Sequence, residues 1–422
     1  MKKRVAALLI LTAFLLTGCM SKPTGVDDLL RAPQLNGQQS GVQKALAAYL
    51  GETPQLKYPA RSFTGEVVSP FVMEDFNGDG TQDAAVFYVS AAKGQNVHVA
   101  ILEQKSTGEW YVTQEKEGLA PAVESISTAE IQPGMGRQLL VGYSGSGEKY
   151  LAVYAYMDKT LNEVLTQPYS QYQLNSMGDE TASDLIVIGP EQSSPLQLQL
   201  LTAENGQFNV KQQLNLKEEF LSCVGLYPSV GEDGSKYLVL DGQTGSGLAS
   251  LILRYNNEQR LENFVPSTVD SFFTTTQRFS TLLRSTDIDG DGKVEIPCQV
   301  DAGEVGALTV NKLSLVSWMD FTGDTCEEVR FGVADLEYGY FLALPPELKG
   351  SIMIASGDEP DSWQVCSLDG EEVYITVRVV APGVQGNSYF RLGNIGAQKV
   401  QARISARIGV TTGDLVAGFF AL

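Results

Sequence analysis

Between about residue 62 and residue 318 the chain alternates short apolar runs with polar loops rich in Gly, Asp, Asn and Ser. The runs contain many β-branched and aromatic residues and are too short for helices, so they predict strands. They fall into pairs, which are residues 84–89 with 97–102, 139–143 with 150–156, 184–188 with 196–201, and 237–242 with 249–255. This pattern predicts an all-β region.

Each pair follows another β-like run and a polar loop, so the region is repetitive. When Gly78, Gly134, Gly178, Gly231 and Gly290 mark the loops, the steps are 56, 44, 53 and 59 residues. A single sheet of three or four strands cannot bury both faces until neighbours stack on it. We therefore predict a mainly β protein in which residues 62–339 form a β-propeller of five to seven blades, each of about 50 residues. A pair of β-sandwiches is the alternative.

The two ends of the chain do not follow this repeat. The sixth loop, "DFTGDTCEE" at residue 320, breaks the period, and residues 340–422 predict a small C-terminal α+β domain. Its terminal helix opens with Thr411 and Asp414 in the spacing of a capping box. Residues 38–61 predict a helix and lead-in, in which Ser40 is the N-cap and Gly51 ends the helix.

Residues 1–18 predict a lipoprotein signal peptide, because three basic residues precede the apolar run 5–16. The following "LTGC" matches a lipobox and makes Cys19 the predicted lipidation site. Residues 19–37 then predict a tether, and we expect an extracytoplasmic protein, anchored to the cell membrane by lipid. An ordinary secretory signal with a chance cysteine is the alternative.

The whole chain has a formal net charge of −20. Without residues 1–18, which contain three basic residues and no acid, 27 basic residues face 50 acidic ones and the charge is −23. This balance argues against nucleic acid as a partner and suits divalent cations. Four cysteines besides Cys19 are widely spaced, and the sequence leaves open whether they pair or stay free: Cys223, Cys298, Cys326 and Cys366.

Two acidic loops have the spacing of a hard-cation site, with oxygen ligands at positions 1, 3, 5 and 9, a backbone carbonyl at position 7, and glycine at position 6. The predicted ligands in the first loop are Asp75, Asn77, Asp79, the carbonyl of Thr81, and Asp83. Those in the second are Asp287, Asp289, Asp291, the carbonyl of Lys293, and Glu295. We predict structural Ca²⁺ in both. Weaker candidates in the loop at 320 are Asp320, Thr322, Asp324 and Glu328.

An EF-hand would need an acid at position 12 and a following helix, but position 12 is Val86 in the first loop and Cys298 in the second. Loops of this kind followed by a strand resemble the calcium loops of FG-GAP or VCBS-type repeats in integrin-like β-propellers. The resemblance covers about residues 60–330 and implies an ion that braces a blade without contacting a substrate. The layout of the whole chain, with its lipobox and these loops, also resembles a family of bacterial surface lipoproteins.

The sequence contains one histidine, His98, which alternates with apolar residues and predicts a satisfied strand residue. No GxSxG or phosphate-loop pattern is present. We therefore expect no enzyme activity, and predict a calcium-stabilised, non-catalytic scaffold that binds a surface protein or an envelope glycan. The alternatives are a surface carbohydrate-active enzyme, a hydrolase or lyase with a carboxylate pair in the propeller channel, and a purely structural envelope component.

Overall fold

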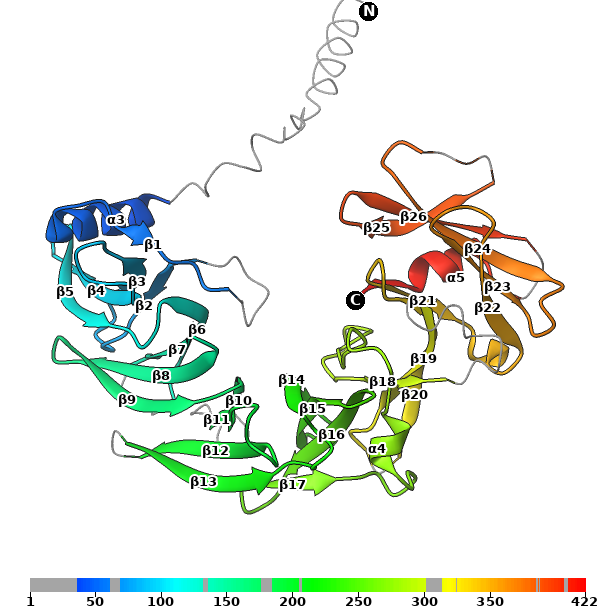
Figure 1. Cartoon of the computed structure of the whole chain (residues 1–422), viewed down its shortest axis with the longest axis horizontal. Coiled ribbons are helices and arrows are strands. Elements are labelled where there is room, and N and C mark those ends of the chain that lie inside the picture. Colours follow the sequence, from blue (N-terminus) through cyan, green and yellow to red (C-terminus); the bar gives the residue numbers. More distant parts are fainter. Residues whose placement is uncertain are drawn as a thin grey trace, which may run out of the picture.

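The computed structural model describes residues 36–60, 69–131, 136–175, 184–204, 207–300, 313–323, 325–384, 386, 388–405 and 409–422. The chain is mainly β, and these residues form six antiparallel sheets of four or five strands, which follow one another in sequence. In Figure 1 the sheets are arranged along a curved path, from the first sheet in blue to the sixth in orange. Among the same residues no helix is long and apolar enough to cross a membrane.

The strands of the six sheets are as follows. The first sheet contains β1 (Gln55–Leu56), β2 (Phe71–Glu74), β3 (Asp83–Val89), β4 (His98–Gln104) and β5 (Trp110–Glu117). The second contains β6 (Ala122–Ala129), β7 (Gln138–Gly145), β8 (Glu148–Met157) and β9 (Thr160–Pro168). The third contains β10 (Gln171–Asn175), β11 (Asp184–Ile188), β12 (Gln197–Glu204) and β13 (Gln207–Asn215). The fourth contains β14 (Ser222–Val230), β15 (Lys236–Thr244), β16 (Gly247–Tyr255) and β17 (Leu261–Phe264).

The fifth sheet contains β18 (Ile296–Gln299), β19 (Leu313–Asp320), β20 (Glu327–Asp335), β21 (Tyr340–Leu344) and the C-terminal strand β27 (Phe419–Ala421). The sixth contains β22 (Ile352–Ser356), β23 (Ser362–Ser367), β24 (Val373–Val380), β25 (Phe390–Ile395) and β26 (Gln398–Ile404). The short helices α4 (Phe272–Thr275), η2 (Pro346–Leu348) and α5 (Thr412–Ala417) lie between strands. Because β27 pairs with β21, the end of the chain returns to the fifth sheet after the sixth is complete.

Consecutive sheets pack face to face, and each contact is an apolar core. Phe87 and Val99 of the first sheet share a core with Val141 and Tyr154 of the second. Similar cores join the second sheet to the third, the third to the fourth, and the fourth to the fifth. This is the stacking that the repeat predicts, since each sheet buries its faces only against neighbours.

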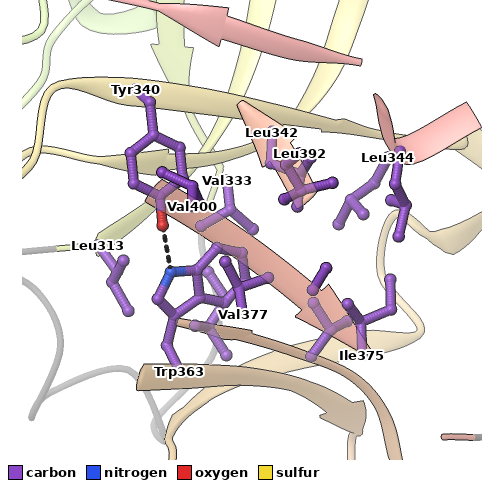
Figure 2. Packing of buried hydrophobic residues seen from close by; sticks show 14 of the residues in the cluster. Leu313, Val333, Tyr340, Leu342, Leu344, Trp363, Ile375, Val377, Leu392 and Val400 are labelled. Carbon is purple, nitrogen blue, oxygen red and sulfur yellow. Dashed lines mark hydrogen bonds between the residues drawn. The ribbon is translucent and has the colours of Figure 1, made fainter. Parts of the chain in front are cut away.

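The two ends of the row of sheets are covered by different elements. On the far face of the first sheet, helix α3 (Gly37–Leu50) packs Val42 and Leu46 against Ala84, Val86 and neighbouring residues. At the other end, the sixth sheet packs one face against the fifth. Figure 2 shows this core, in which the indole Nε1 of Trp363 donates a hydrogen bond of 2.8 Å to the hydroxyl of Tyr340.

The eight apolar runs recognised in the sequence all form strands, and each predicted pair is the central hairpin of one of the first four sheets. The N-cap of α3 is Asn36, not Ser40, because Asn36 and Gln39 form a capping box that starts the helix earlier; Gly51 ends the helix in the left-handed conformation, as predicted. The box of Thr411 and Asp414 at α5 is confirmed. The proposed domain boundary at residue 340 falls at the start of β21, inside the fifth sheet.

Candidate metal centre

The two acidic loops have the same backbone frame. The first joins β2 to β3, and the pair Glu74 and Asp83 closes it. The second is closed in the same register by an isolated bridge between Thr286 and Glu295, just before β18. Position 9 of each loop is therefore fixed by strand pairing.

Within each loop, the first aspartate organises the turn. The Asp75 carboxylate accepts N–H groups from Gly78 at 2.7 Å and from Gly80 at 2.8 Å. The Asp287 carboxylate does the same, with Gly290 at 2.7 Å and Gly292 at 2.9 Å. All four glycines have positive φ values, from 74° to 90°, a conformation that side chains with a Cβ rarely adopt. The same aspartates and glycines that predict a cation site therefore also stabilise the fold of each loop.

The carboxylates at position 9 are buried and point into the loops. Asp83 and Glu295 are each 1% exposed, although the other loop acids are partly or fully exposed. Each accepts one backbone N–H, from Phe76 at 3.1 Å and from Ile288 at 2.9 Å. Burial raises the pKa of Asp83 to about 6 and that of Glu295 to about 7, and the other loop aspartates add to both shifts. A bound cation would remove the repulsion that raises these pKa values.

The second loop has the more convergent ligand set. One carboxylate oxygen each from Asp287, Asp289 and Glu295 lies within 4.8 Å of the other two. Hard oxygen ligands at such separations suit Ca²⁺, whose ligands lie at about 2.3–2.6 Å from the ion. Among the residues that the structure describes, the first loop does not bring Asp75, Asp79 and Asp83 together to this extent. There, Asn77 donates its amide to Asp79 at 3.1 Å, and Thr81 donates its N–H to Asp79 at 2.7 Å.

Both loops lie where neighbouring sheets meet. Phe76, at position 2, is 1% exposed in the core between the first and second sheets, and its carbonyl packs closely against Gly136, which lies just before β7 of the second sheet. In the second loop, Val294 donates its N–H to the Ser229 hydroxyl of β14 at 3.0 Å. An ion in either loop would therefore stiffen a contact between sheets.

The side chain of Lys293, whose carbonyl is a predicted ligand, links the second loop to the loop at 320. Its Nζ lies 3.4 Å from Asp320, 3.3 Å from Glu232 and 3.7 Å from Asp291. Asp320 also accepts the N–H and hydroxyl of Thr322, and Glu328 pairs with Lys349. Three of the four weaker candidates are thus engaged with protein groups, and Asp324 lies outside the described residues. Lys293 thus neutralises Asp320. It also lies near Asp291 of the second loop, and Arg330 lies 3.9 Å from Asp289, so a metal at either loop would compete with these cations.

A buried ion pair holds the segment that leads into the second loop. Asp241 of β15 and Arg278 are 0% and 1% exposed, and Nη2 of Arg278 lies 2.7 Å from Oδ1 of Asp241 without a hydrogen-bonding angle. Asp241 also accepts the N–H and the hydroxyl of Ser285, both at 2.7 Å. Ser285 lies two residues before Asp287, so this pair sets where the loop begins.

The second loop also borders a cavity of about 710 Å³, which sequence reasoning did not find. It is lined by Tyr227, residues 282–288, which include Arg284 and Asp287, and the C-terminal residues 419–422. The strand β14 and the C-terminus lie on the concave side of the curved row of sheets (Figure 1). Burial and Asp241 raise the pKa of Tyr227, so its hydroxyl stays protonated at neutral pH. These lining residues are far apart in sequence, and only the fold brings them together.

The remaining candidates are placed away from this centre. His98 begins β4 and is 5% exposed; its Nδ1 lies 3.0 Å from Glu115 Oε1, but neither ring nitrogen has a hydrogen-bond partner among the described residues. Cys223, Cys298, Cys326 and Cys366 are all free thiols, and burial raises the pKa of each. Cys19 lies outside the described residues.

No protein-family model and no curated protein matches the chain. Solved structures do match, among them a "putative 6-phosphogluconolactonase" of Bacteroides fragilis, with 11% identity, a TM-score of 0.30, and coverage of 72% of this chain and 92% of that one. A protein from Lactobacillus plantarum matches with 9% identity, a TM-score of 0.33, and coverage of 72% and 94%. A "putative 6-phosphogluconolactonase" of Bacteroides uniformis matches with 13% identity, a TM-score of 0.29, and coverage of 70% and 91%. Similarity at this level assigns no residue roles or substrate to the present chain.

These findings correct two predictions. The resemblance to FG-GAP or VCBS-type repeats is wrong as a family assignment, because no family model matches and the matching structures bear other names. An Asp-rich turn recurs wherever a tight loop needs its N–H groups satisfied, so it does not by itself identify a family. The expectation that the chain is not an enzyme is also wrong against these matches, since two of the three bear enzyme names. The comparisons support neither calcium binding nor a lipid anchor.

Proposed function

We propose that the protein binds a divalent cation, favouring Ca²⁺, at the second acidic loop, and that the ion stabilises the contact between the fourth and fifth sheets. The observation that carries this proposal is the convergence of Asp287, Asp289 and Glu295 within 4.8 Å, together with the raised pKa of Glu295. The first loop is proposed as a second, weaker site because its frame is the same. Affinities of about 10⁻⁴ to 10⁻³ M would suffice outside a cell.

Calorimetric titration with Ca²⁺ tests the proposal. We expect Asp287→Asn to remove the tighter binding event and Asp75→Asn the weaker one. Asp369→Asn is a matched control, because Asp369 also organises a turn through Ser367 and Glu371 but belongs to no cluster of three metal-ligating groups among the described residues. Equal titration curves for wild type and Asp287→Asn, or binding of no Ca²⁺ by the wild-type protein, would exclude the site.

As a second candidate function, we propose a carbohydrate-active hydrolase or lyase that uses the cavity beside the second loop. The observation in its favour is that Asp287 belongs to both the candidate metal centre and the cavity lining. A divalent cation held by Asp287, Asp289 and Glu295 would supply a Lewis acid that can polarise a substrate oxygen. Arg284 would bind an anionic group of the substrate, the Tyr227 hydroxyl would donate a hydrogen bond, and Phe419 and Phe420 provide apolar walls.

A panel of chromogenic glycosides and acidic oligosaccharides tests this activity. Arg284→Ala and Tyr227→Phe should each lower turnover without changing the melting temperature, whereas Lys217→Ala, outside the cavity lining, should not. No turnover on any substrate, or equal turnover in the Arg284→Ala variant, would contradict the candidate.

We propose, finally, that the chain acts outside the cytoplasm, anchored by lipid at Cys19. The support is the order of charged start, apolar run and "LTGC" in residues 1–19. Membrane fractionation of wild type and Cys19→Ala tests it, since loss of the anchor should release the protein. Equal retention of both in the membrane fraction would contradict the anchor.

A further inference from the structure

The hairpin turns of the first three sheets and the connections between these sheets lie at the same strand ends. Neighbouring strands of an antiparallel sheet run in opposite directions, so the turn after the second strand lies beside the end of the fourth. In the second sheet, Tyr150 follows the turn between β7 and β8 and pairs with Pro168 at the end of β9. The next strand, β10, begins at Gln171, which pairs with Ile188 just before the hairpin loop of the third sheet. Each connection therefore lies beside two hairpin turns.

Backbone hydrogen bonds hold these connections in place. The connection after β9 donates N–H groups to the carbonyl of Lys149 in the second sheet at 3.2 Å and to that of Ile188 in the third at 2.9 Å. In the connection after β5, Gly118 and Ala120 exchange hydrogen bonds of 2.7 and 3.0 Å with Val97 of the first sheet. The surface that they form is therefore preorganised, and a ligand bound there would lose little affinity to ordering the chain.

Three hollows of about 510, 510 and 470 Å³ follow one another along this surface. The first lies at the loop between β3 and β4, the second at the turn between β7 and β8, and the third reaches the loop between β11 and β12. The first and second share Pro121 as a wall, and the second and third share Glu148 and Tyr150. Each volume is within the range of ligand sites. The three hollows thus form one groove across the first three sheets.

The lining of the groove is polar but mostly neutral. Amides, hydroxyls, prolines and tyrosines predominate in the second and third hollows, where the charged residues are Glu148, Lys149 and Glu191. Two of these three already have partners, because Nζ of Lys149 lies 3.7 Å from Glu124 and Glu148 accepts the hydroxyl of Tyr150 at 2.6 Å. Such a lining favours a ligand with many hydroxyl groups over a charged one.

Tyr150 is the central side chain of the groove. It is half-buried, it lines both the second and the third hollow, and its bond to Glu148 orients the ring. A tyrosine ring offers a sugar ring an apolar face. Asn96 in the second hollow donates its amide to Glu117 at 2.9 Å, which leaves the side-chain oxygen to accept a hydroxyl, and Gln192 supplies an amide in the third.

Other polymers fit the groove less well. An extended peptide binds by adding a strand to a sheet edge, whereas this groove crosses the ends of strands. The lining contains two lysines and three glutamates, so it does not form the basic surface that nucleic acid or an acidic polysaccharide requires. Leu119 is the one strongly exposed large apolar residue in the lining, which is too little for a membrane surface.

We propose that this groove binds a linear neutral polysaccharide, with one sugar ring against Tyr150 and the neighbouring units in the hollows on either side. The groove shares no lining residue with the metal centre or with the cavity beside the second loop. The inference therefore goes beyond the proposed function and does not depend on it.

Calorimetric titration with cellohexaose, maltohexaose, xylohexaose and mannohexaose tests the proposal. We expect at least one of them to bind, and to bind more tightly than its disaccharide, because a longer chain occupies more of the groove. Tyr150→Ala should weaken this binding about tenfold or more, whereas Tyr150→Phe, which keeps the ring, should retain most of it.

Tyr111→Ala is the matched control. The hydroxyl of Tyr111 also donates to a glutamate, Glu103, at 2.6 Å, but this tyrosine does not line the groove. Its substitution should leave the affinity unchanged, and so should Asp287→Asn, which separates the groove from the metal centre.

Several results would overturn the proposal. These are no binding of any of the four hexasaccharides, equal affinity for the disaccharide, or unchanged affinity in the Tyr150→Ala variant. Equal losses in the Tyr150→Ala and Tyr111→Ala variants would show a general effect on the fold instead of a contact with the sugar. Equal affinity for a galacturonate hexasaccharide would contradict the preference for a neutral chain.

Discussion

The backbone N–H of Ile288 donates a hydrogen bond of 2.9 Å to the buried carboxylate of Glu295, which is 1% exposed. One such bond does not compensate for burial and for three nearby aspartates, so the pKa of Glu295 rises to about 7. The same relationship between Phe76 and Asp83 in the first loop recurs with a pKa of about 6. Each loop thus contains a buried carboxyl group. At neutral pH its burial is favourable only when a proton or a cation neutralises it.

The first prediction concerns pH in the presence of a chelator. These carboxylates have higher pKa values in the folded than in the unfolded protein, so the folded state binds more protons between the two values. Their contribution to stability is therefore full below the unfolded pKa of about 4–4.5 and is lost as the pH rises through about 6 and 7. Melting temperatures should fall from pH 5 to pH 8 in chelator, and saturating Ca²⁺ should flatten this slope.

Glu295→Gln is the matched variant, since it keeps the acceptor for Ile288 and removes the titrating group. In chelator, the melting temperature of this variant should fall less steeply with pH than that of the wild-type protein. If the slope of this variant equals that of the wild type, the pH dependence comes from other groups.

The second prediction concerns the buried pair of Asp241 and Arg278. Arg278→Met would leave the Asp241 carboxylate buried without its cation, which costs about 3–5 kcal/mol of unfolding free energy. Replacing both residues, by Asp241→Leu and Arg278→Met, should cost less than the single change. Denaturant unfolding measures both values, and a loss below about 1 kcal/mol for Arg278→Met would show that the pair does not hold the 276–285 segment.

The third prediction concerns the core between the fifth and sixth sheets. Tyr340→Phe removes the acceptor for the indole N–H of Trp363, which is 3% exposed. This substitution should lower the free energy of unfolding by about 1–3 kcal/mol. Tyr58→Phe, at a tyrosine that is 45% exposed, is the control and should change nothing measurable. Equal unfolding midpoints for the two variants would mean that water replaces the lost acceptor.

The fourth prediction concerns the helix that covers the first sheet. Leu46 is fully buried against the sheet, and Leu46→Ala should cost about 2–5 kcal/mol by leaving a cavity. Tyr49→Ala on the same helix, at a residue 55% exposed, should cost far less. If Leu46→Ala lowers the free energy of unfolding only slightly, α3 does not contribute to the stability of the first sheet.

The sequence predicts the fold well because each blade carries its own local signals. The central hairpins are continuous apolar runs, and a run buried on both faces is easy to recognise. The outer strands β5, β9 and β13 are mostly half-buried or exposed, so they carry weak signals. The return of β27 to the fifth sheet is not predicted, because this sheet takes strands from residues 296–344 and from 419–421, and no local pattern reports a strand that returns from the end of the chain.

The sequence could anticipate proximity only for groups that are close in sequence. The spacing of Asp287, Asp289 and Glu295 predicts one cluster, and the structure brings these side chains together. The engagement of Asp320 by Lys293 depends on two loops meeting in space. The cavity that joins Tyr227 to Phe420 likewise depends on tertiary packing.

The most direct test of the central claim is the melting temperature of wild type and Asp287→Asn, each in chelator and in Ca²⁺ at about 100 times the dissociation constant. A site that binds only the folded state should add about 2.7 kcal/mol at that concentration. We predict that Ca²⁺ raises the melting temperature of the wild-type protein, and that Asp287→Asn loses most of this gain. An equal rise in both proteins, or no rise in the wild type, would contradict a cation at the second loop.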